Sequence, residues 1–167
     1  KTDAELGRLT VSSVDADTDG DGDADRLVAF GARSLSVWDA QLNLVADTGD
    51  LLERKVAELS PSSFNSNGTA STLDTRSDNK GPEPEGVVSG VVGGKTLAFV
   101  GLERAGGVVV LDVSNPANPT YVDYMHFITP SAAPDSGTAG DLGPEGLLFI
   151  PAADSPSGQA LLVASFE

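Results

Sequence analysis

An all-β fold made of repeated antiparallel units is predicted by this sequence. Short apolar runs separated by Gly, Pro, Asn and Asp turns recur along the 167 residues. The segment 84–103 has a second copy at 144–167, and one stretch alone, 50–59, has helical spacing. Repeated four-stranded units are typical of β-propeller blades. We therefore expect residues 1–167 to form a single partial propeller domain of about two to three blades, with one short helix in an insertion between blades.

The first blade is expected over residues 9–47. Its four short strands are predicted at residues 9–14, 27–32, 35–39 and 42–46, where apolar residues alternate between turn signals. An acidic loop separates the first two strands. Trp38, in the third strand, is expected to pack within the blade.

Residues 50–80 form an insertion whose sequence pattern differs from that of the predicted strands on either side. Leu51, Leu52, Val56 and Leu59 recur at helical spacing, and Asp50 can serve as the N-cap. This pattern predicts one helix of two to three turns. Residues 60–80 are rich in Ser, Asn, Thr and Asp, and long polar loops of this kind are often functional or mobile.

A second blade is predicted over residues 84–127, followed by a loop at 128–142 and the start of a third blade at 145–167. The second blade has strands at 85–92, 96–102, 107–113 and 120–127, and the third has strands at 145–150 and 160–167.

An internal repeat relates the last two units. Pro84-Glu85-Gly86 matches Pro144-Glu145-Gly146, and the run 94–103 matches 158–167. A propeller closes with about four or more blades. The remaining blades are therefore expected from the same protein or from another chain.

Charge limits the partners. The chain has 25 acidic and 10 basic residues and a net charge of −15, which argues against nucleic acid as a partner because phosphate binding requires a basic surface. The absence of cysteine excludes disulfides and thiolate metal sites. No apolar run approaches the length of a transmembrane segment.

The acidic loop predicts a calcium site. Asp residues occupy positions 1, 3, 5 and 9 counted from Asp17, and Gly22 occupies position 6. Alternating short carboxylates let a tight loop direct several oxygens at one hard cation. Position 12 is Val28 instead of the Glu of an EF-hand, so a helix-flanked EF-hand is disfavoured. The alternative is a solvated acidic turn without an ion.

Repeated glutamates predict a second site. Glu85 and Glu145 open the first strand of their units, and Glu103 and Glu167 end the second. Equivalent carboxylates of successive blades would line one face of the central channel. With Arg76, Lys80 and Arg104 nearby, they could hold metal ions that in turn bind phosphate. The alternative is that each Glu makes a structural hydrogen bond or ion pair at a blade junction.

Other catalytic patterns are weak. His126 is the single histidine and is expected to be structural. No Gly-x-Ser-x-Gly elbow is present, which gives no support to an α/β-type hydrolase.

Two local segments resemble motifs of known propellers. The acidic loop resembles the calcium loops of FG-GAP and integrin-type propeller blades. That resemblance implies side-chain ligation by Asp17, Asp19, Asp21 and Asp25 and carbonyl ligation by Asp23. The segment 108–120 resembles the LVIVD-type repeat of surface propellers, which concerns fold alone.

Three further segments, 76–86, 101–104 and 142–152, resemble the bacterial choice-of-anchor I family. Its members are secreted or surface-anchored propellers often labelled alkaline-phosphatase-like or phytase-like. The resemblance implies an extracellular, periplasmic or cell-envelope location. Two functions then compete. One is a calcium-dependent phosphoesterase, in which the glutamates hold the ions and a phosphoester substrate is bound by Arg76, Lys80 or Arg104. The other is a non-catalytic adhesion or envelope-assembly module with structural calcium.

Overall fold

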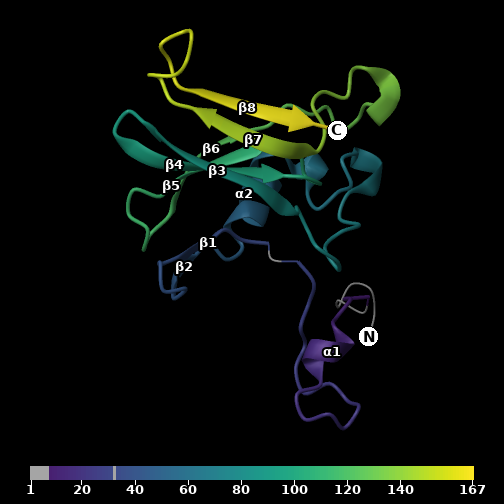
Figure 1. Ribbon diagram of the computed structural model, residues 1–167. Helices are drawn as coiled ribbons and strands as arrows, with labels where there is room; N and C mark the ends of the chain where they lie inside the picture. The colour runs from purple at the N-terminus through teal and green to yellow at the C-terminus, as the bar shows by residue number, and fades with distance from the viewer. Residues whose placement is uncertain (1–7, 32) are drawn as a thin grey trace.

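The computed structural model describes residues 8–31 and 33–167 and shows a mostly β protein (Figure 1). Within these residues, eight strands form three antiparallel sheets, and helices are few. The helices are α1 (Ser13–Ala16) and α2 (Leu51–Leu59), with 3-10 turns at Pro61–Ser63, Ala70–Thr72 and Pro134–Ser136. The strands are β1 (Ser36–Trp38), β2 (Leu44–Asp47), β3 (Pro84–Val92), β4 (Lys95–Leu102), β5 (Val108–Asp112), β6 (Thr120–Met125), β7 (Pro144–Ile150) and β8 (Leu161–Phe166).

The central sheet contains β3, β4, β5 and β6 in sequence order, each antiparallel to the next. These strands lie within two residues of the predicted bounds of the second unit. The turn between β3 and β4 uses Gly93 and Gly94, whose φ angles of 59° and 80° are readily adopted by glycine. Tight turns between apolar runs therefore produce the expected meander.

The hairpin β7–β8 repeats the register of β3–β4. Pro84 faces Leu102 as Pro144 faces Phe166, and both hairpins have an irregularity directly after the proline. Beyond it, Val88 faces Phe99 as Leu148 faces Val163. The sequence repeat is therefore also a structural repeat.

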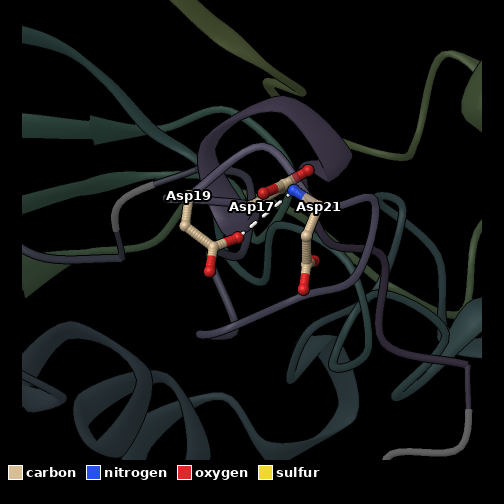
Figure 2. A group of neighbouring side chains, drawn as sticks. All are labelled: Asp17, Asp19 and Asp21. Atoms are coloured by element: carbon tan, nitrogen blue, oxygen red, sulfur yellow. Dashed lines mark hydrogen bonds between the residues drawn. The ribbon is translucent and has the colours of Figure 1, made fainter.

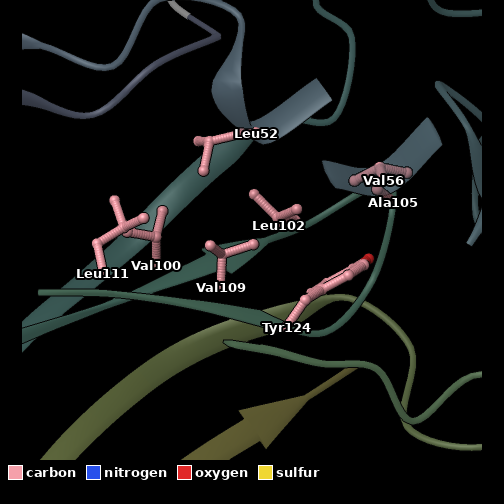
Figure 3. Close-up of a cluster of buried hydrophobic side chains, with 8 residues drawn as sticks. All are labelled: Leu52, Val56, Val100, Leu102, Ala105, Val109, Leu111 and Tyr124. Carbon is pink, nitrogen blue, oxygen red and sulfur yellow. The ribbon is translucent and has the colours of Figure 1, made fainter. Parts of the chain in front are cut away.

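Both faces of the central sheet are covered. On one face, Leu52 and Val56 of α2 are buried against a group from β4, β5, β6 and the turn after β4 (Figure 3), which consists of Val100, Leu102, Ala105, Val109, Leu111 and Tyr124. On the other face, Phe99, Val108 and Val110 contact the β7–β8 hairpin through Leu147, Phe149 and Leu162. The rings of Phe99 and Phe149 stack with centroids 5.8 Å apart.

Helix α2 occupies the predicted stretch. Asp50 takes the N-cap position, but its carboxylate makes no cap bond and instead accepts a hydrogen bond from Arg54 Nε at 2.8 Å. The helix is held mainly by burial of its apolar face.

The N-terminal unit differs from the predicted four-stranded blade. Of the strands expected at 9–14 and 27–32, the structure has a single bridge between Val11 and Ala29, and Ala32 lies outside the described residues. Residues 13–16 form α1 because the Ser12 hydroxyl caps the Asp15 amide. Among the described residues of this unit, only β1 and β2, close to the strands predicted at 35–39 and 42–46, form a sheet. Trp38, expected to be packed, is 56% exposed.

Close contact between the two repeated hairpins predicts that Gly90 tolerates no side chain. A Cβ at Gly90 would lie 2.2 Å from the Phe149 ring. We expect Gly90→Ala to lower the free energy of unfolding by about 1–3 kcal/mol, the usual cost of overpacking. Urea unfolding would measure it, with Ser89→Ala, exposed on the same strand, as the control. Phe149→Leu should restore part of the loss, and equal stability of the two alanine variants would contradict this packing.

Candidate functional site

The acidic loop begins where α1 ends. The carbonyl of buried Ala16 accepts hydrogen bonds from the amides of Asp25 and Arg26 at 3.1 and 3.4 Å, which closes the loop. Gly20 and Gly22 have φ angles of 82° and 96°, so the tight turns of the loop use a conformation that favours glycine. The closed loop holds its aspartates on one short segment of chain.

Three aspartates of the loop converge (Figure 2). One carboxylate oxygen each of Asp17, Asp19 and Asp21 lies within 4.8 Å of the others. The Asp17 carboxylate accepts hydrogen bonds from the amides of Gly20 and Gly22, at 2.6 and 3.0 Å. These bonds fix Asp17 toward the centre of the loop. A set of three carboxylate donors fits a hard cation such as calcium.

The other two expected ligands are placed differently. The Asp25 carboxylate accepts hydrogen bonds from the hydroxyl and amide of Thr18, at 2.5 and 2.8 Å, and these bonds lower the pKa of Asp25. Asp25 thus stabilises the loop through its hydrogen bonds with Thr18. Asp23 lies outside the converging group, and its amide donates to Asp21 at 3.0 Å.

The predicted glutamates gather in two overlapping groups at the ends of the strands. Glu83, Glu85 and Glu103 each place a carboxylate oxygen within 4.8 Å of the others, and so do Glu103, Glu145 and Glu167. Glu103 directly follows β4 and belongs to both groups. The shared register of β3–β4 and β7–β8, together with their face-to-face packing, brings these side chains together.

Glu83 is a member of this cluster that the sequence repeat does not predict. Its side chain is 3% exposed and forms an ion pair with Arg76. Lys80 Nζ and Arg104 Nε each lie 3.5 Å from its carboxylate oxygens. Arg104 also reaches Glu103, with 2.5 Å between Nη2 and Oε1. The three cations expected to receive phosphate therefore face carboxylates.

Glu83 also has an unusual backbone. Its φ angle is 50°, and its counterpart in the second unit is Gly143, with the same φ of 50°. A left-handed conformation is normal for glycine and costly for most other residues. Because the repeat alignment pairs Glu83 with a glycine, the alignment did not indicate a functional role for Glu83. The signal that was present is a second carboxylate in Glu83-Pro84-Glu85, a few residues after Arg76 and Lys80.

Titration of this cluster is altered by its neighbours. The hydrogen bond with Glu103 raises the pKa of the Glu85 carboxyl, and burial adds to the effect. Burial lowers the pKa of Arg76, and the charge of Arg104 contributes further. Carboxylates thus lie close to other carboxylates, and guanidinium groups lie close to one another. The ion pairs between the two sets of charges offset this repulsion.

A small cavity of about 170 Å³ adjoins the second glutamate group. It is lined by Asn67, Gly68, Glu103, Arg104, Pro134, Leu142, Gly143 and Glu167. The Glu167 amide donates to the carbonyls of Leu142 and Gly143, each at 3.1 Å, and so fixes Glu167 at the cavity wall. The lining combines two carboxylates and one guanidinium, a polar set suited to a small ion or water.

His126 follows β6 and joins it to the segment after α2. Its Nε2 lies 3.1 Å from the Ser60 hydroxyl and 3.4 Å from the Ser63 hydroxyl. Ser63 is fully buried, and burial lowers the pKa of His126. A buried hydroxyl is closed to substrate, so this contact is suited to a structural role.

The fold and these clusters define the class of protein: a repeat-built antiparallel β protein with an acidic loop and a charged cluster where its repeated hairpins meet. The chain belongs to the choice-of-anchor I domain family, whose sequence model matches residues 1–116.

Two curated relatives are longer than this chain. Gigasin-3a of Magallana gigas is 31% identical over 175 residues, which cover 98% of this chain and 61% of the relative. The mesenchyme-specific cell surface glycoprotein of Strongylocentrotus purpuratus is 28% identical over 135 residues, covering 72% of this chain and 17% of the relative. The chain thus spans less than two thirds of either protein. No solved structure matches the chain.

The buried position of Glu83 predicts a large cost for its neutralisation. Glu83→Gln leaves Arg76 and Arg104 without their shared partner, and loss of one member of a buried ion pair typically costs about 3–5 kcal/mol. Chemical denaturation would measure the loss. Glu58→Gln, which removes the exposed partner of Lys55, is the matched control and should change stability by less than about 1 kcal/mol. Equal effects of the two substitutions would refute the central role of Glu83.

Proposed function

We propose that this chain is part of a secreted or cell-surface β-propeller that holds a structural calcium ion in the Asp17–Asp25 loop. The convergence of Asp17, Asp19 and Asp21 is the observation on which this function rests. An extracellular location is supported by the family and by the relative that is named as a cell surface glycoprotein. Within the described residues, no helix is long and apolar enough to span a membrane.

The propeller part of the proposal is supported by the repeat. Two hairpins share one register and pack face to face, and the first is extended by β5 and β6 into a four-stranded meander. Stacked four-stranded antiparallel sheets are the unit of propeller architecture. Further blades, from the same protein or from another chain, would complete the ring.

The role of calcium follows from the charge and position of the loop. Three carboxylates held close together repel one another, and a divalent cation removes this repulsion. Asp17, Asp19 and Asp21 would hold the ion, with Asp23 and Asp25 as the further expected ligands. The loop lies away from the two buried clusters of the sheet (Figure 1), so the ion would stiffen the N-terminal unit.

Calcium binding is therefore predicted to depend on the loop. Calorimetric titration should show binding to the wild-type chain and its loss in Asp19→Asn/Asp21→Asn, while Asp135→Asn/Asp154→Asn, which changes two exposed acids elsewhere, should bind normally. Bound calcium should stabilise the chain by about 2.7 kcal/mol when free calcium exceeds Kd a hundredfold. Unchanged calcium affinity in the loop variant would contradict the site.

A second candidate function, a calcium-dependent phosphoesterase, is supported by the cavity beside Glu103, Arg104 and Glu167. A metal ion held by Glu103, Glu145 and Glu167 would polarise a phosphoryl oxygen and activate water. Arg104 would then orient the phosphate. The ion pairs of Arg76, Lys80 and Arg104 with Glu83 weigh against this function, because they already neutralise the cations.

Turnover of p-nitrophenyl phosphate in calcium would test this candidate. If the site is catalytic, Glu145→Gln/Glu167→Gln should abolish turnover, because both residues are exposed members of the second group and their loss removes metal ligands. Glu58→Gln should leave the rate unchanged. Absence of turnover by the wild-type chain would leave the non-catalytic surface module as the function.

A further inference from the structure

Asn67 and Gly68 form the single Asn-Gly pair of the sequence. Asparagine is a chemically labile residue, because the backbone nitrogen of the next residue can attack its side-chain carbonyl carbon. The attack is intramolecular, so its rate depends on how freely the two groups approach each other. Glycine has no Cβ and lets its backbone nitrogen approach with the least hindrance. The sequence thus places the least hindered backbone nucleophile next to this one asparagine.

The structure leaves both reacting groups free. Asn67 is exposed, and neither its side-chain amide nor the backbone amide of Gly68 forms a hydrogen bond with another described residue. Gly68 has a φ of 83°, and apart from its chain neighbours no heavy atom lies within 4 Å of the position that a Cβ would take. The space around the pair therefore admits water and the rotation that ring closure requires.

The chain on either side of the pair is anchored. The Asn67 amide donates to the Thr72 hydroxyl at 2.9 Å, and the Ala70 amide donates to the Pro130 carbonyl at 2.7 Å. Ser66, directly before the pair, is fully buried. The pair is therefore an open turn between two fixed segments.

The other five asparagines lack this combination of features. Asn115 and Asn118 precede prolines, which have no amide N–H to supply the nucleophile. Asn65 is 1% exposed, and its side chain donates two hydrogen bonds. The Asn43 side chain donates a hydrogen bond at 2.9 Å. Asn79 is exposed but precedes a lysine, whose side chain hinders the approach of its amide.

The Asp-Gly pairs of the acidic loop show the opposite arrangement. Gly20 and Gly22 follow Asp19 and Asp21, and such pairs undergo the same kind of ring closure. Their amides, however, donate to the Asp17 carboxylate at 2.6 and 3.0 Å. These hydrogen bonds hold the two nitrogens away from attack. The fold thus protects the acidic loop and leaves the Asn-Gly pair open.

We propose that Asn67 is a site of spontaneous intramolecular deamidation. The Gly68 nitrogen loses its proton to hydroxide and attacks Cγ of Asn67. The bond from Cγ to Nδ2 then breaks, and Nδ2 takes up a proton and leaves as ammonia. Water opens the resulting succinimide ring at either carbonyl and gives aspartate or isoaspartate. Water is the only co-reactant, and the inference goes beyond the proposed function and depends on neither the calcium loop nor the propeller.

The product changes the charge of the cavity beside the second glutamate group. Asn67 and Gly68 line this cavity together with Glu103, Arg104 and Glu167. Deamidation adds a third carboxylate to a lining that has two carboxylates and one guanidinium. The lining becomes more negative and better suited to a hard cation. The charge of this cavity therefore changes with the age of the protein.

Peptide mapping by mass spectrometry tests the proposal on the full chain, incubated in neutral buffer and sampled over time. The tryptic peptide of residues 56–76 should gain the mass difference between an amide and an acid. Fragmentation should place the change at Asn67 and detect isoaspartate there, while Asn65 on the same peptide keeps its amide. The rate should rise with pH, because the nucleophile is the deprotonated nitrogen.

Two variants and one control sharpen the test. Gly68→Ala should slow the reaction at least about tenfold, because the added methyl group hinders the approach of the nitrogen. Asn67→Gln should abolish it, because the longer side chain closes a less favourable ring. Asn79→Gln, which changes another exposed asparagine, should leave the rate at Asn67 unchanged. Equal urea midpoints would show that the variants keep the fold.

Three results would overturn the proposal. The first is an intact Asn67 in the folded chain after a synthetic peptide of residues 64–70 has deamidated, because the fold would then protect the pair. The second is an equal rate in the wild type and Gly68→Ala. The third is a glycan on Nδ2 in the naturally produced protein, since Asn67-Gly68-Thr69 also has the pattern of a glycan acceptor.

Discussion

Burial of β4 and β5 from both sides organises the other elements of the central sheet and its neighbours. Alternate residues of these strands face opposite layers, so that Val100 and Val109 meet α2 while Phe99 and Val110 meet the β7–β8 hairpin. Burial of an apolar side chain contributes about 1.5–3 kcal/mol. Two layers of such contacts fix the helix, the central sheet and the second hairpin relative to one another.

The charged cluster is a consequence of this packing. Because both hairpins start with Pro-Glu-Gly and end with Glu, their alignment brings carboxylates from β3, β4, β7 and β8 to one place. The excess negative charge there is offset by cations: Arg76, Lys80 and Arg104 each lie beside the Glu83 carboxylate. Glu83 retains a backbone conformation that its counterpart Gly143 adopts without strain, which indicates that its ion pairs compensate for that conformation.

The acidic loop is organised differently. Its structure comes from bonds between neighbouring residues, such as those of the Asp17 carboxylate with Gly20 and Gly22 and of Asp25 with Thr18. It lies outside both apolar clusters, and residues near it such as Val14 and Leu27 are exposed. The two candidate sites therefore differ in physical origin: one is made by tertiary packing and the other by local turns.

The family was indicated by the resemblance of segments 76–86, 101–104 and 142–152 to it, and the family model confirms it. Local pattern in the sequence was sufficient to predict the strands of the central sheet, helix α2 and the repeat of 84–103 at 144–167. These features were accessible because alternation, helical spacing and turn residues act over a few positions. In the N-terminal unit, the strands predicted at 35–39 and 42–46 are present as β1 and β2. Those predicted at 9–14 and 27–32 were wrong, since the capped turn at Ser12 and the bonds of the acidic loop compete with strand pairing. Tertiary contacts were needed to establish that Glu83 lies beside three cations and that Glu103 belongs to both glutamate groups. Each of these depends on which distant segments meet, and that is set by packing across the sheet.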